Sequence, residues 1–347
     1  MTQTDTRDST EPIPEHAQEH APDQGSFPQA TDPFRRELLA HCYRMTGSVH
    51  DAEDLVQETY LRAWRAYDRF EGRSSVRTWL YRIATNVCLT ALEGRDRRPM
   101  PTGLGAPAGD ATEPVQADGE VPWLEPVPDA LVGDPATVVA ERDTIRLAFV
   151  AAIQHLPPRQ RAVLILRDVL RWRAAEVAEA LESTTASVNS ALQRAHATLE
   201  KANLSADTVG EPTPEQQEML DRYVQAFWDK DIAAIVSMLT HDAIWEMPPF
   251  TGWYQGAQTI GVLIDTQCPG QRHDMVMLPT RANGQPAFGL YMRTPDGSFE
   301  PFQLQVLTIG PGGVEHVGAF FGEDVFATFA LPATLSADEA AALLPTR

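Results

Sequence analysis

A segment without helical or strand periodicity divides this chain and excludes a single compact fold. Residues 100–135, MPTGLGAPAGDATEPVQADGEVPWLEPVPDALVGDP, are rich in Gly and Pro and contain acids but no base. Because Gly and Pro interrupt regular structure, a stretch of this length and composition predicts a linker. We place this acidic linker at residues 100–140, between two stretches in which apolar residues recur at helical spacing.

The rest of the chain divides around this linker into modules of different character. Apolar periodicity predicts helices on both sides of it, whereas alternating stretches such as PFQLQVLTI near the C-terminus predict a sheet. The expected fold class is therefore multidomain, with two all-α modules and an α+β domain. The predicted boundaries are 1–33 for a disordered acidic tail, 34–99 and 141–204 for the two all-α modules, 205–214 for a second linker, 215–335 for the α+β domain and 336–347 for a C-terminal tail.

The formal net charge of −20 is unevenly distributed along the chain. Residues 34–99 carry 12 Arg against nine acids, and residues 141–204 carry nine bases against seven acids, so these modules have net charges of +3 and +2. Net charge bears on partners rather than on the fold. Nucleic acid therefore remains a candidate partner of the two helical modules.

The cysteines and the apolar runs limit the class of protein further. Cys42, Cys88 and Cys268 are isolated, which argues against a zinc site or a disulfide framework and fits a reducing cytoplasm. No run of about 18 apolar residues predicts a membrane span. The N-terminus has neither the basic start nor the apolar core of a secretory signal. We expect a cytoplasmic protein with no cofactor, no metal and no membrane partner.

The stretch DAEDLVQETYLRAW, residues 51–64, opens with acids inside the first basic module. Ser48 with Asp51 resembles a capping box, and acids suit the positive end of a helix dipole. Asp51, Asp54 and Glu58 share one face of the predicted helix. Helical spacing predicts a different, buried stripe, formed by Ala52, Leu55, Val56, Ala63 and Trp64. Spacing alone leaves two interpretations open: the acids cap and solubilise the helix, or they dock another protein.

Downstream, a loop from Glu71 to Ser75 leads into another predicted helix. This helix offers basic, aromatic and amide groups together, namely Arg77, Trp79, Tyr81, Arg82 and Asn86. Basic groups contact phosphates, aromatic rings stack on unpaired bases, and Asn reads base edges. The alternative is an ordinary amphipathic helix with Trp79 or Tyr81 in the core.

These two motifs at this spacing, the second being FEGRSSVRTWLYRIATNVCLTAL, resemble region 2 of the extracytoplasmic-function (ECF) sigma factors of bacterial RNA polymerase, in the sigma-70 family. The resemblance implies that the acidic helix docks on the clamp helices of the polymerase β′ subunit, through Asp51, Asp54, Gln57, Glu58 and Arg62. It also implies that the loop and the following helix open and capture the promoter −10 element, through Arg69, Ser74, Ser75, Arg77, Arg82 and Asn86.

The second module predicts a helix-turn-helix from the segment LPPRQRAVLILRDVLRWRAAEVAEALESTTASVNSALQRAHATLEK. Pro is tolerated in the first turn of a helix, and Thr184 suits the cap of the last one. In that last helix the residues expected to face inward are Val188, Leu192, Ala195 and Leu199. The second helix of such a motif enters the major groove, and its exposed residues would be Thr185, Ser187, Asn189, Ser190, Gln193 and Arg194. A helical hairpin used for protein contacts is the alternative.

The same segment resembles region 4 of the ECF sigma factors, which reads the promoter −35 element and touches the polymerase β flap. It departs from the family at Glu182, where Gly is usual because Gly adopts positive φ at little cost, and at Asn189 and Ala191, which replace commonly basic residues. Since affinity for duplex DNA grows with the number of phosphates neutralised, we expect the protein alone to bind duplex DNA poorly. In the family the linker threads the polymerase interior; a solvated tether is the alternative.

The third module contains the segment AFWDKDIAAIVSMLTHDAIWEMPPFTGWYQGAQTI and the late strands PFQLQVLTI and VEHVGAFF. On these stretches, residues 215–332 resemble the SnoaL-like branch of the NTF2-like fold, a cone of curved sheet and helices around a pocket. The residues that could line or polarise such a pocket are Trp245, Met247, Phe250, Trp253, Tyr254, Asp242, His273, Arg281 and Gln303. An Asp–His pair could act as general acid and base. However, aromatic residues commonly form a core, and sequence alone gives no convergence of these groups.

The expected function is that of an alternative sigma factor, which binds core RNA polymerase and promoter DNA and leaves the chemistry to the polymerase. The C-terminal domain would regulate it, packing on the sigma modules by charge complementarity. A small-molecule ligand of that domain and an anti-sigma factor remain open as further partners. The alternative is a SnoaL-like isomerase or hydrolase fused to a DNA-binding accessory module. A helix-turn-helix repressor would leave residues 51–64 without a role.

Overall fold

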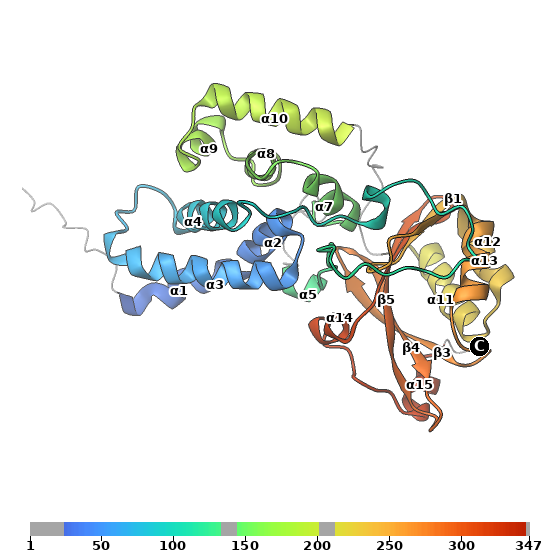
Figure 1. The fold of residues 1–347 in the computed structure, drawn as a ribbon. Coiled ribbons are helices and arrows are strands. Elements are labelled where there is room, and N and C mark those ends of the chain that lie inside the picture. Colours follow the sequence, from blue (N-terminus) through green and yellow to red (C-terminus); the bar gives the residue numbers. More distant parts are fainter. Residues whose placement is uncertain (1–23, 133–143, 201–211, 345–347) are drawn as a thin grey trace, which may run out of the picture.

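The computed structural model describes residues 24–132, 144–200 and 212–344. Three parts lie against one another: a first helical module, a second helical module packed on it, and a C-terminal domain built on a sheet beside both (Figure 1). The predicted tail over residues 1–23, the end of the first linker and most of the second linker lie outside the described residues.

The first module is a small helical bundle. Gly47 ends its second helix with a φ of +71°, a left-handed conformation that Gly adopts at little cost. Ser48 and Ser75 begin the next two helices, because their hydroxyls accept from the backbone nitrogens of Asp51 and Thr78, both at 3.1 Å. The helices are α1 (Phe27–Thr31), α2 (Arg35–Thr46), α3 (Val49–Ala66) and α4 (Val76–Ala91).

Residues 24–33, predicted to be disordered, are ordered against this bundle. The Phe27 side chain is 7% exposed, and its ring meets the Tyr67 ring edge-on at 5.1 Å. The Tyr60 hydroxyl donates to the Thr31 carbonyl at 2.9 Å. The boundary at residue 33 is therefore wrong, because one aromatic anchor outweighs the polar, acidic composition around it.

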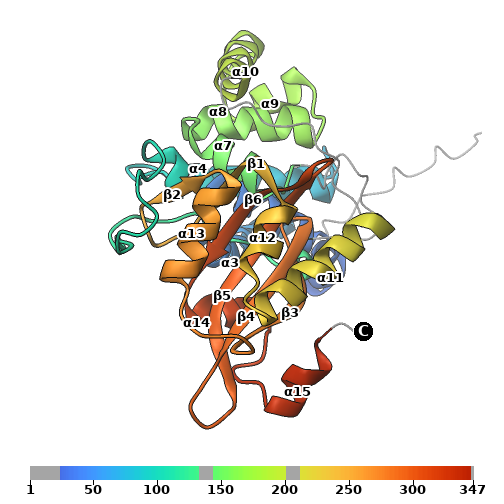
Figure 2. The same cartoon turned by 90° about the vertical axis from the view of Figure 1, so that its right-hand side faces the viewer.

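The first linker is packed, not solvated, over residues 100–132. Figure 1 and Figure 2 show it running along the C-terminal domain. It contains a 3₁₀ turn at Pro101–Gly103 and the short helix α5 (Asp129–Val132), which lies against α2. The side chains of Ala111, Leu124 and Val127 are buried. The alternative of a solvated tether does not hold for this part of the linker.

The second module is a helix-turn-helix. The Glu182 backbone in the turn has a φ of +48°, the conformation for which Gly is usual. Thr184 begins the last helix, since its hydroxyl accepts from the Ser187 nitrogen at 3.2 Å. Val188 and Ala195 are buried, as expected, with Leu192 and Leu199 partly buried. The helices are α7 (Leu147–Gln154), α8 (Pro158–Leu164), which continues into a π-helical turn at Ile165–Val169, α9 (Ala174–Ala180) and α10 (Thr185–Glu200).

The C-terminal domain is a six-stranded sheet in the order β2-β1-β6-β5-β4-β3, with three helices over one face (Figure 2). Neighbouring strands are antiparallel except β1 and β6, which are parallel. Its strands are β1 (Leu239–Glu246), β2 (Trp253–Gln255), β3 (Met275–Ala282), β4 (Gln285–Arg293), β5 (Phe299–Gly310) and β6 (Gly313–Phe320). Its helices are α11 (Pro214–Trp228), α12 (Ile232–Met238), α13 (Ala257–Gln267), α14 (Glu323–Thr328) and α15 (Ala337–Ala342). The helix α15 replaces part of the expected C-terminal tail.

The two faces of the sheet belong to different apolar cores. Under α11, α12 and α13 lie the side chains of Trp245, Phe288 and Leu307. The opposite face contributes Leu304 and Phe320 to a core that continues through both helical modules. Full burial of one such side chain stabilises a fold by about 1.5–3 kcal/mol. The C-terminal domain is therefore packed against the helical modules and not merely tethered to them.

Candidate nucleic-acid interface

One face of α3 is exposed and combines acidic with apolar side chains. Asp54, Gln57 and Arg62 are exposed, and Arg62 Nε donates to Glu58 Oε1 at 2.6 Å. Leu61 and Trp64 are 50% and 47% exposed. The prediction that Trp64 is buried is wrong, because the buried stripe of α3 passes through Ala63 and the next residue is rotated by about 100°. Large apolar side chains left exposed among acids suit the docking of another protein.

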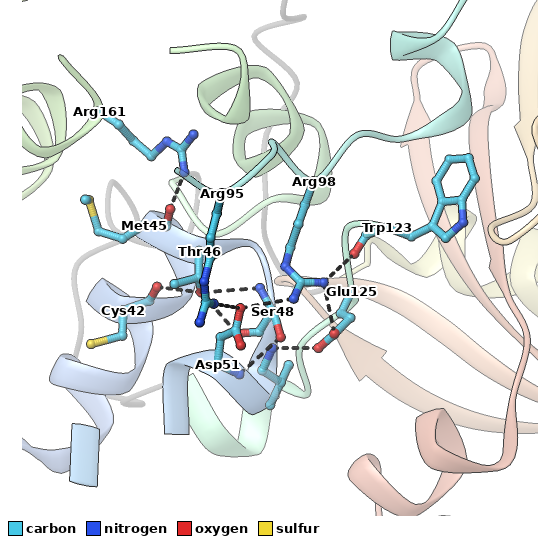
Figure 3. A network of polar contacts seen from close by, with 11 residues as sticks. Cys42, Met45, Thr46, Ser48, Asp51, Arg95, Arg98, Trp123, Glu125 and Arg161 are labelled. Carbon is cyan, nitrogen blue, oxygen red and sulfur yellow. Dashed lines mark hydrogen bonds and ion pairs between the residues drawn. The ribbon is translucent and has the colours of Figure 1, made fainter. Parts of the chain in front are cut away.

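Asp51 is not free on this face. Its Oδ2 atom accepts from Arg95 Nη1 at 3.2 Å and from Arg98 Nη2 at 3.0 Å (Figure 3). Arg98 also donates to the linker, at the Trp123 carbonyl. Only the Ser48 half of the predicted capping box forms, since Asp51 turns to the arginines. The structure thus uses Asp51 to join the end of the first module to the linker.

The basic and aromatic residues of α4 are largely engaged within the protein. Arg77 Nε donates to Glu37 Oε2 at 2.6 Å, and its guanidinium lies 5.0 Å from the Tyr81 ring centroid. Tyr81 is buried, and the Trp79 ring packs at 4.9 Å from Phe70, so both belong to the core. Exposed or partly exposed among the predicted −10 residues are Arg69, Ser74, Ser75, Arg77, Arg82 and Asn86.

The second module packs directly on α4. Arg82 Nη1 on α4 donates to Glu179 Oε1 on α9 at 3.1 Å. The Tyr81 ring meets the Trp172 ring edge-on at 6.4 Å. The helix predicted to capture the −10 element is therefore partly covered by the module predicted to read the −35 element.

A buried arginine also joins the two modules. Arg161, on α8, is 3% exposed and donates to the Met45 carbonyl at the end of α2 (Figure 3). It also donates to the Ile153 carbonyl at 3.0 Å. Burial lowers the pKa of Arg161 to about 10, which leaves it charged at neutral pH. The Arg161 cation, bound mainly by carbonyl oxygens, therefore keeps the end of α2 close to α7 and α8.

The predicted −35 residues share the open surface of α10. All six are exposed: Thr185, Ser187, Asn189, Ser190, Gln193 and Arg194. Arg194 Nη1 donates to Ser190 Oγ at 2.6 Å. Figure 1 shows α10 along the outer edge of the molecule, away from the C-terminal domain. This helix is accessible to DNA without rearrangement.

The turn between β3 and β4 connects all three parts of the molecule. Its Asn283 is fully buried, with a φ of +55°. Asn283 Nδ2 donates to the Tyr43 hydroxyl of the first module and to the Ile145 carbonyl before α7, both at 2.9 Å. Asn283 Oδ1 accepts from the Val127 nitrogen of the linker at 3.0 Å. One amide side chain therefore contacts the first module, the linker and the approach to the second module.

Sequence reasoning missed Asn283. The signal was present, since Asn-Gly between two alternating stretches predicts a two-residue hairpin turn. Nearby contacts extend the junction: Arg281 Nε donates to Asp129 Oδ2 at 3.1 Å, and the Leu147 nitrogen donates to Gln285 Oε1 at 3.2 Å. The turn was recognisable from sequence, but its target was not, because the target lies far away along the chain.

The residues predicted to line a C-terminal pocket do not converge. Trp245, Met247, Phe250 and Tyr254 belong to the apolar core under the helices. His273 lies on an exposed loop, where its Nε2 atom is 3.4 Å from Asp229 Oδ1 and not beside Asp242. Arg281 faces the linker, Trp253 Nε1 donates to the Gly105 carbonyl, and Gln303 is buried on β5. An acid–base pair of Asp242 with His273 is thus not formed.

Within residues 24–132, 144–200 and 212–344, no three His, Cys, Asp or Glu side chains are grouped as a metal site requires. Over the same ranges, no helix has the length and apolar character needed to cross a membrane.

The family models match both helical modules. Sigma-70 region 2 matches residues 32–98, and sigma-70 region 4 matches residues 146–199. A chain that joins these two regions is a sigma factor of bacterial RNA polymerase. Members of this family bind core polymerase and promoter DNA.

Relatives place the chain within this class. It is 57% identical over 317 residues to the ECF RNA polymerase sigma factor SigG of Mycobacterium tuberculosis strain H37Rv, covering 90% of this chain and 85% of the relative. It is 30% identical over 180 residues to the ECF sigma factor SigW of Bacillus subtilis, covering 52% of this chain and 89% of the relative. The chain therefore belongs to the ECF sigma factors.

The crystal structure of the M. tuberculosis sigma factor SigJ has a similar fold. The TM-score is 0.56 at 23% identity, covering 87% of this chain and 98% of that chain. The predicted fold class is confirmed: two helical sigma modules with a C-terminal α+β domain. The predicted function, an alternative sigma factor for transcription initiation, is confirmed with it.

Proposed function

We propose that the SnoaL-like domain regulates this sigma factor by holding its two DNA-reading modules together. The observation that carries the proposal is the packing of the second module on the first, in which the buried Arg161 of α8 donates to the Met45 carbonyl of α2 and Arg82 of α4 donates to Glu179 at 3.1 Å. The C-terminal domain reinforces that contact through Asn283, which bonds to both sides of the junction.

The geometry of a promoter supports this proposal. Positions −10 and −35 lie about 25 base pairs apart, which is about 85 Å along B-form DNA at 3.4 Å per base pair. Here α4 and α10 are separated by only the thickness of α8 and α9, and a helix is about 10–12 Å across. The two modules must separate before they can occupy both elements together.

The binding residues are assigned within this proposal. Asp54, Gln57, Glu58 and Arg62 contact the β′ clamp helices of the polymerase, with Leu61 and Trp64 adding apolar surface. Asp51 instead supports the linker. Arg82 and Asn86 on α4 contact the −10 element, while the exposed residues of α10 contact the −35 element and the second module touches the β flap. The protein acts in the bacterial cytoplasm, where polymerase and chromosome are found.

The C-terminal domain regulates and does not catalyse. A wet pocket with convergent Asp and His would favour an enzyme, but His273 pairs with Asp229 on an exposed loop. Trp245 Nε1 and Gln303 Oε1 are buried without a hydrogen-bond partner among the described residues. These are the atoms at which a small ligand or a water would bind. An anti-sigma factor is a second candidate regulator.

Run-off transcription with core polymerase tests this function. The full chain would be compared with a chain ending at residue 204, and start sites mapped genome-wide. We expect both proteins to start at the same promoters, with the shorter chain at least severalfold more active at equal concentration. The shorter chain exposes apolar surface, so its folding would be verified by circular dichroism, and the full-length Asn283→Gly variant would be compared in the same transcription assay. Equal activity and an unchanged response to candidate ligands would contradict a regulatory role.

A further inference from the structure

The residue types on α10 favour one kind of base pair over the other. Between Thr185 and Glu200 the charged side chains are Arg194 and Glu200, whose formal charges cancel, and the titratable His196. Arg and Lys are the side chains that bind guanine O6 and N7 in the major groove, whereas Asn and Gln bind adenine N6 and N7. A recognition helix with amides and little positive charge is therefore suited to A·T pairs.

Several polar groups of α10 are already engaged within the protein. Arg194 Nη1 donates to Ser190 Oγ at 2.6 Å, and His196 Nε2 lies 2.6 Å from Asp168 Oδ2. Thr198 Oγ1 donates to the Arg194 carbonyl at 3.0 Å. These contacts use the basic groups of the helix and leave its two amide side chains.

The two amides, Asn189 and Gln193, lie one helical turn apart on the open surface of α10 (Figure 1). Over the described parts of the chain, neither side chain hydrogen-bonds to another residue. Four residues along a helix rotate a side chain by about 40° and advance it by about 6 Å. Because successive base pairs rise by about 3.4 Å, this advance matches about two base-pair steps. Each amide can therefore reach a base pair of its own.

Ala186 completes this face of the helix. It is exposed and lies seven residues before Gln193, which places the two side chains about 20° apart around the helix. The N-terminal residues of a recognition helix contact base edges, and an alanine methyl suits the C5-methyl group of thymine. Arg194 directly follows Gln193 and is rotated from it by about 100°, so it suits a phosphate beside the groove.

We propose that α10 reads A·T base pairs of the −35 element: Asn189 and Gln193 each bind an adenine, and Ala186 contacts a thymine methyl group. The inference rests on the proposed function, which assigns α10 to the −35 element, and it adds the base pairs that the helix selects. Each amide with two hydrogen bonds to adenine should favour that base at least about fivefold. A phosphate contact by Arg194 positions the helix without selecting bases.

The base preference of the complete protein, bound to core polymerase, tests this assignment. A promoter from the genome-wide map of start sites would serve as template, with the base pairs of its −35 element randomised. Each template would be identified by a sequence tag in its own transcript. We expect A·T at two positions about two steps apart, each favoured at least about fivefold over G·C.

Two variants establish which residue reads which base pair. Gln193→Arg and Asn189→Arg each replace an amide by a guanidinium, which binds guanine O6 and N7. Each variant should change the preference from A·T to G·C at one position, a different position for each, and leave the other unchanged. Gln258→Arg adds the same charge at an exposed position of α13 and should leave every base preference unaltered. Circular dichroism would verify that the three variants are folded.

The contact of Ala186 is tested with deoxyuridine, which lacks the methyl group of thymine. Each thymine of the −35 element would be replaced by deoxyuridine in turn. At one position we expect transcription by the unaltered protein to fall about two- to fourfold, the effect of one buried methyl group. The Ala186→Gly variant should transcribe both templates equally. If the variant responds to deoxyuridine as strongly as the unaltered protein, the role of Ala186 is wrong.

Other results would overturn the reading of A·T pairs. The assignment is wrong if the unaltered protein selects G·C at the positions that respond to the arginine variants, or if neither variant changes any base preference. An absence of base preference throughout the randomised element would remove α10 from −35 recognition altogether. Regulation by the C-terminal domain is tested separately, since the chain ending at residue 204 retains α10 and should keep the same base preferences whether or not its activity rises.

Discussion

Arg82 on α4 and Glu179 on α9 form an ion pair across the boundary between the two sigma modules, at 3.1 Å between Nη1 and Oε1. Their side chains are 40% and 74% exposed, and exposed pairs contribute about 0–1 kcal/mol. The pair therefore engages Arg82, a residue predicted to contact the −10 element, without holding the modules together. The buried contacts of Arg161 and Asn283 supply the holding interaction.

Glu179→Gln releases Arg82 at little cost to the closed arrangement. We expect binding to core polymerase, followed by fluorescence anisotropy, to change less than about fivefold in low salt, because an exposed pair contributes about 1 kcal/mol or less. The difference should vanish as salt screens the charges. Glu182→Gln, at an exposed position in the turn that follows α9, is the control. A change of more than twentyfold would mean that this pair alone closes the protein.

Replacement of Asn283 should open the junction between the three parts. Asn283→Gly keeps the positive φ but leaves the Val127 nitrogen and the Ile145 carbonyl unpaired, and each lost partner costs about 1–3 kcal/mol. We expect the free energy of unfolding, measured in urea, to fall by about 2–5 kcal/mol. Asn283→Ala adds backbone strain of about 1 kcal/mol. Substitutions at surface positions usually change the free energy of unfolding by less than about 0.5 kcal/mol. A decrease no larger than this in the Asn283→Gly variant would show that the turn is dispensable for stability.

Reversal of charge on α3 should abolish polymerase binding and leave the fold intact. Asp54 is exposed, and Glu58 pairs with Arg62 within the same helix, where such a pair contributes about 0.3–0.5 kcal/mol. The double variant Asp54→Lys/Glu58→Lys should therefore lose more than tenfold in affinity for core polymerase, with an unchanged circular dichroism spectrum. Glu93→Lys, exposed elsewhere in the first module, should bind normally. If the double variant unfolds, or if it binds core polymerase as well as the unaltered protein, Asp54 and Glu58 only cap and solubilise the helix.

His41 should make the first module sensitive to acid. Burial lowers the pKa of His41 to about 3, and its Nδ1 atom has no partner among the described residues, so the folded imidazole stays neutral. The unfolded chain binds a proton near the ordinary pKa of about 6.5, and between these two pKa values the unfolded state holds more protons. The contribution of the neutral His41 to the free energy of unfolding is therefore fully present above the unfolded pKa of about 6.5, and it decreases as the pH falls towards 3.

The expected loss is about 1.4 kcal/mol per pH unit between pH 6 and pH 4. His41→Gln retains an amide that can donate to Thr85 Oγ1, the partner of His41 Nε2 at 3.0 Å, and removes the titration. Urea unfolding at several pH values should show a shallower pH dependence for the variant by this amount. Parallel curves for the two proteins would exclude His41 as the cause.

The sequence predicted the elements better than their contacts with one another. The caps at Ser48 and Thr184 were predicted from neighbouring residues, and the structure forms both of them. Trp64 was misplaced because one residue in a helix rotates the side chain by about 100°, which spacing does not resolve at the edge of a stripe. The contacts of Asn283 depend on residues far away in the chain, such as Tyr43, so no local pattern points to them.

The charges of the candidate site show the same limit, because spacing along a helix does not reveal which acids are paired within the fold. The sequence placed Asp51 with Asp54 and Glu58 on one helical face, yet Asp51 binds Arg95 and Arg98. Those arginines come from the stretch after α4, whose return to the start of α3 is a property of the tertiary fold. Which acid of a face remains available to a partner is decided by such returning segments.

The position of Asn283 near the end of the chain has a consequence for biosynthesis. The ribosome completes both sigma modules by residue 200, whereas the turn that joins them follows 83 residues later. At 5–20 residues per second the interval is about 4–17 s. During that interval the nascent chain carries both helices predicted to contact the promoter, α4 and α10, without the Asn283 amide that connects the two modules. A message truncated between these two points would encode both sigma modules without Asn283 and, under the proposed function, a sigma factor without that regulation.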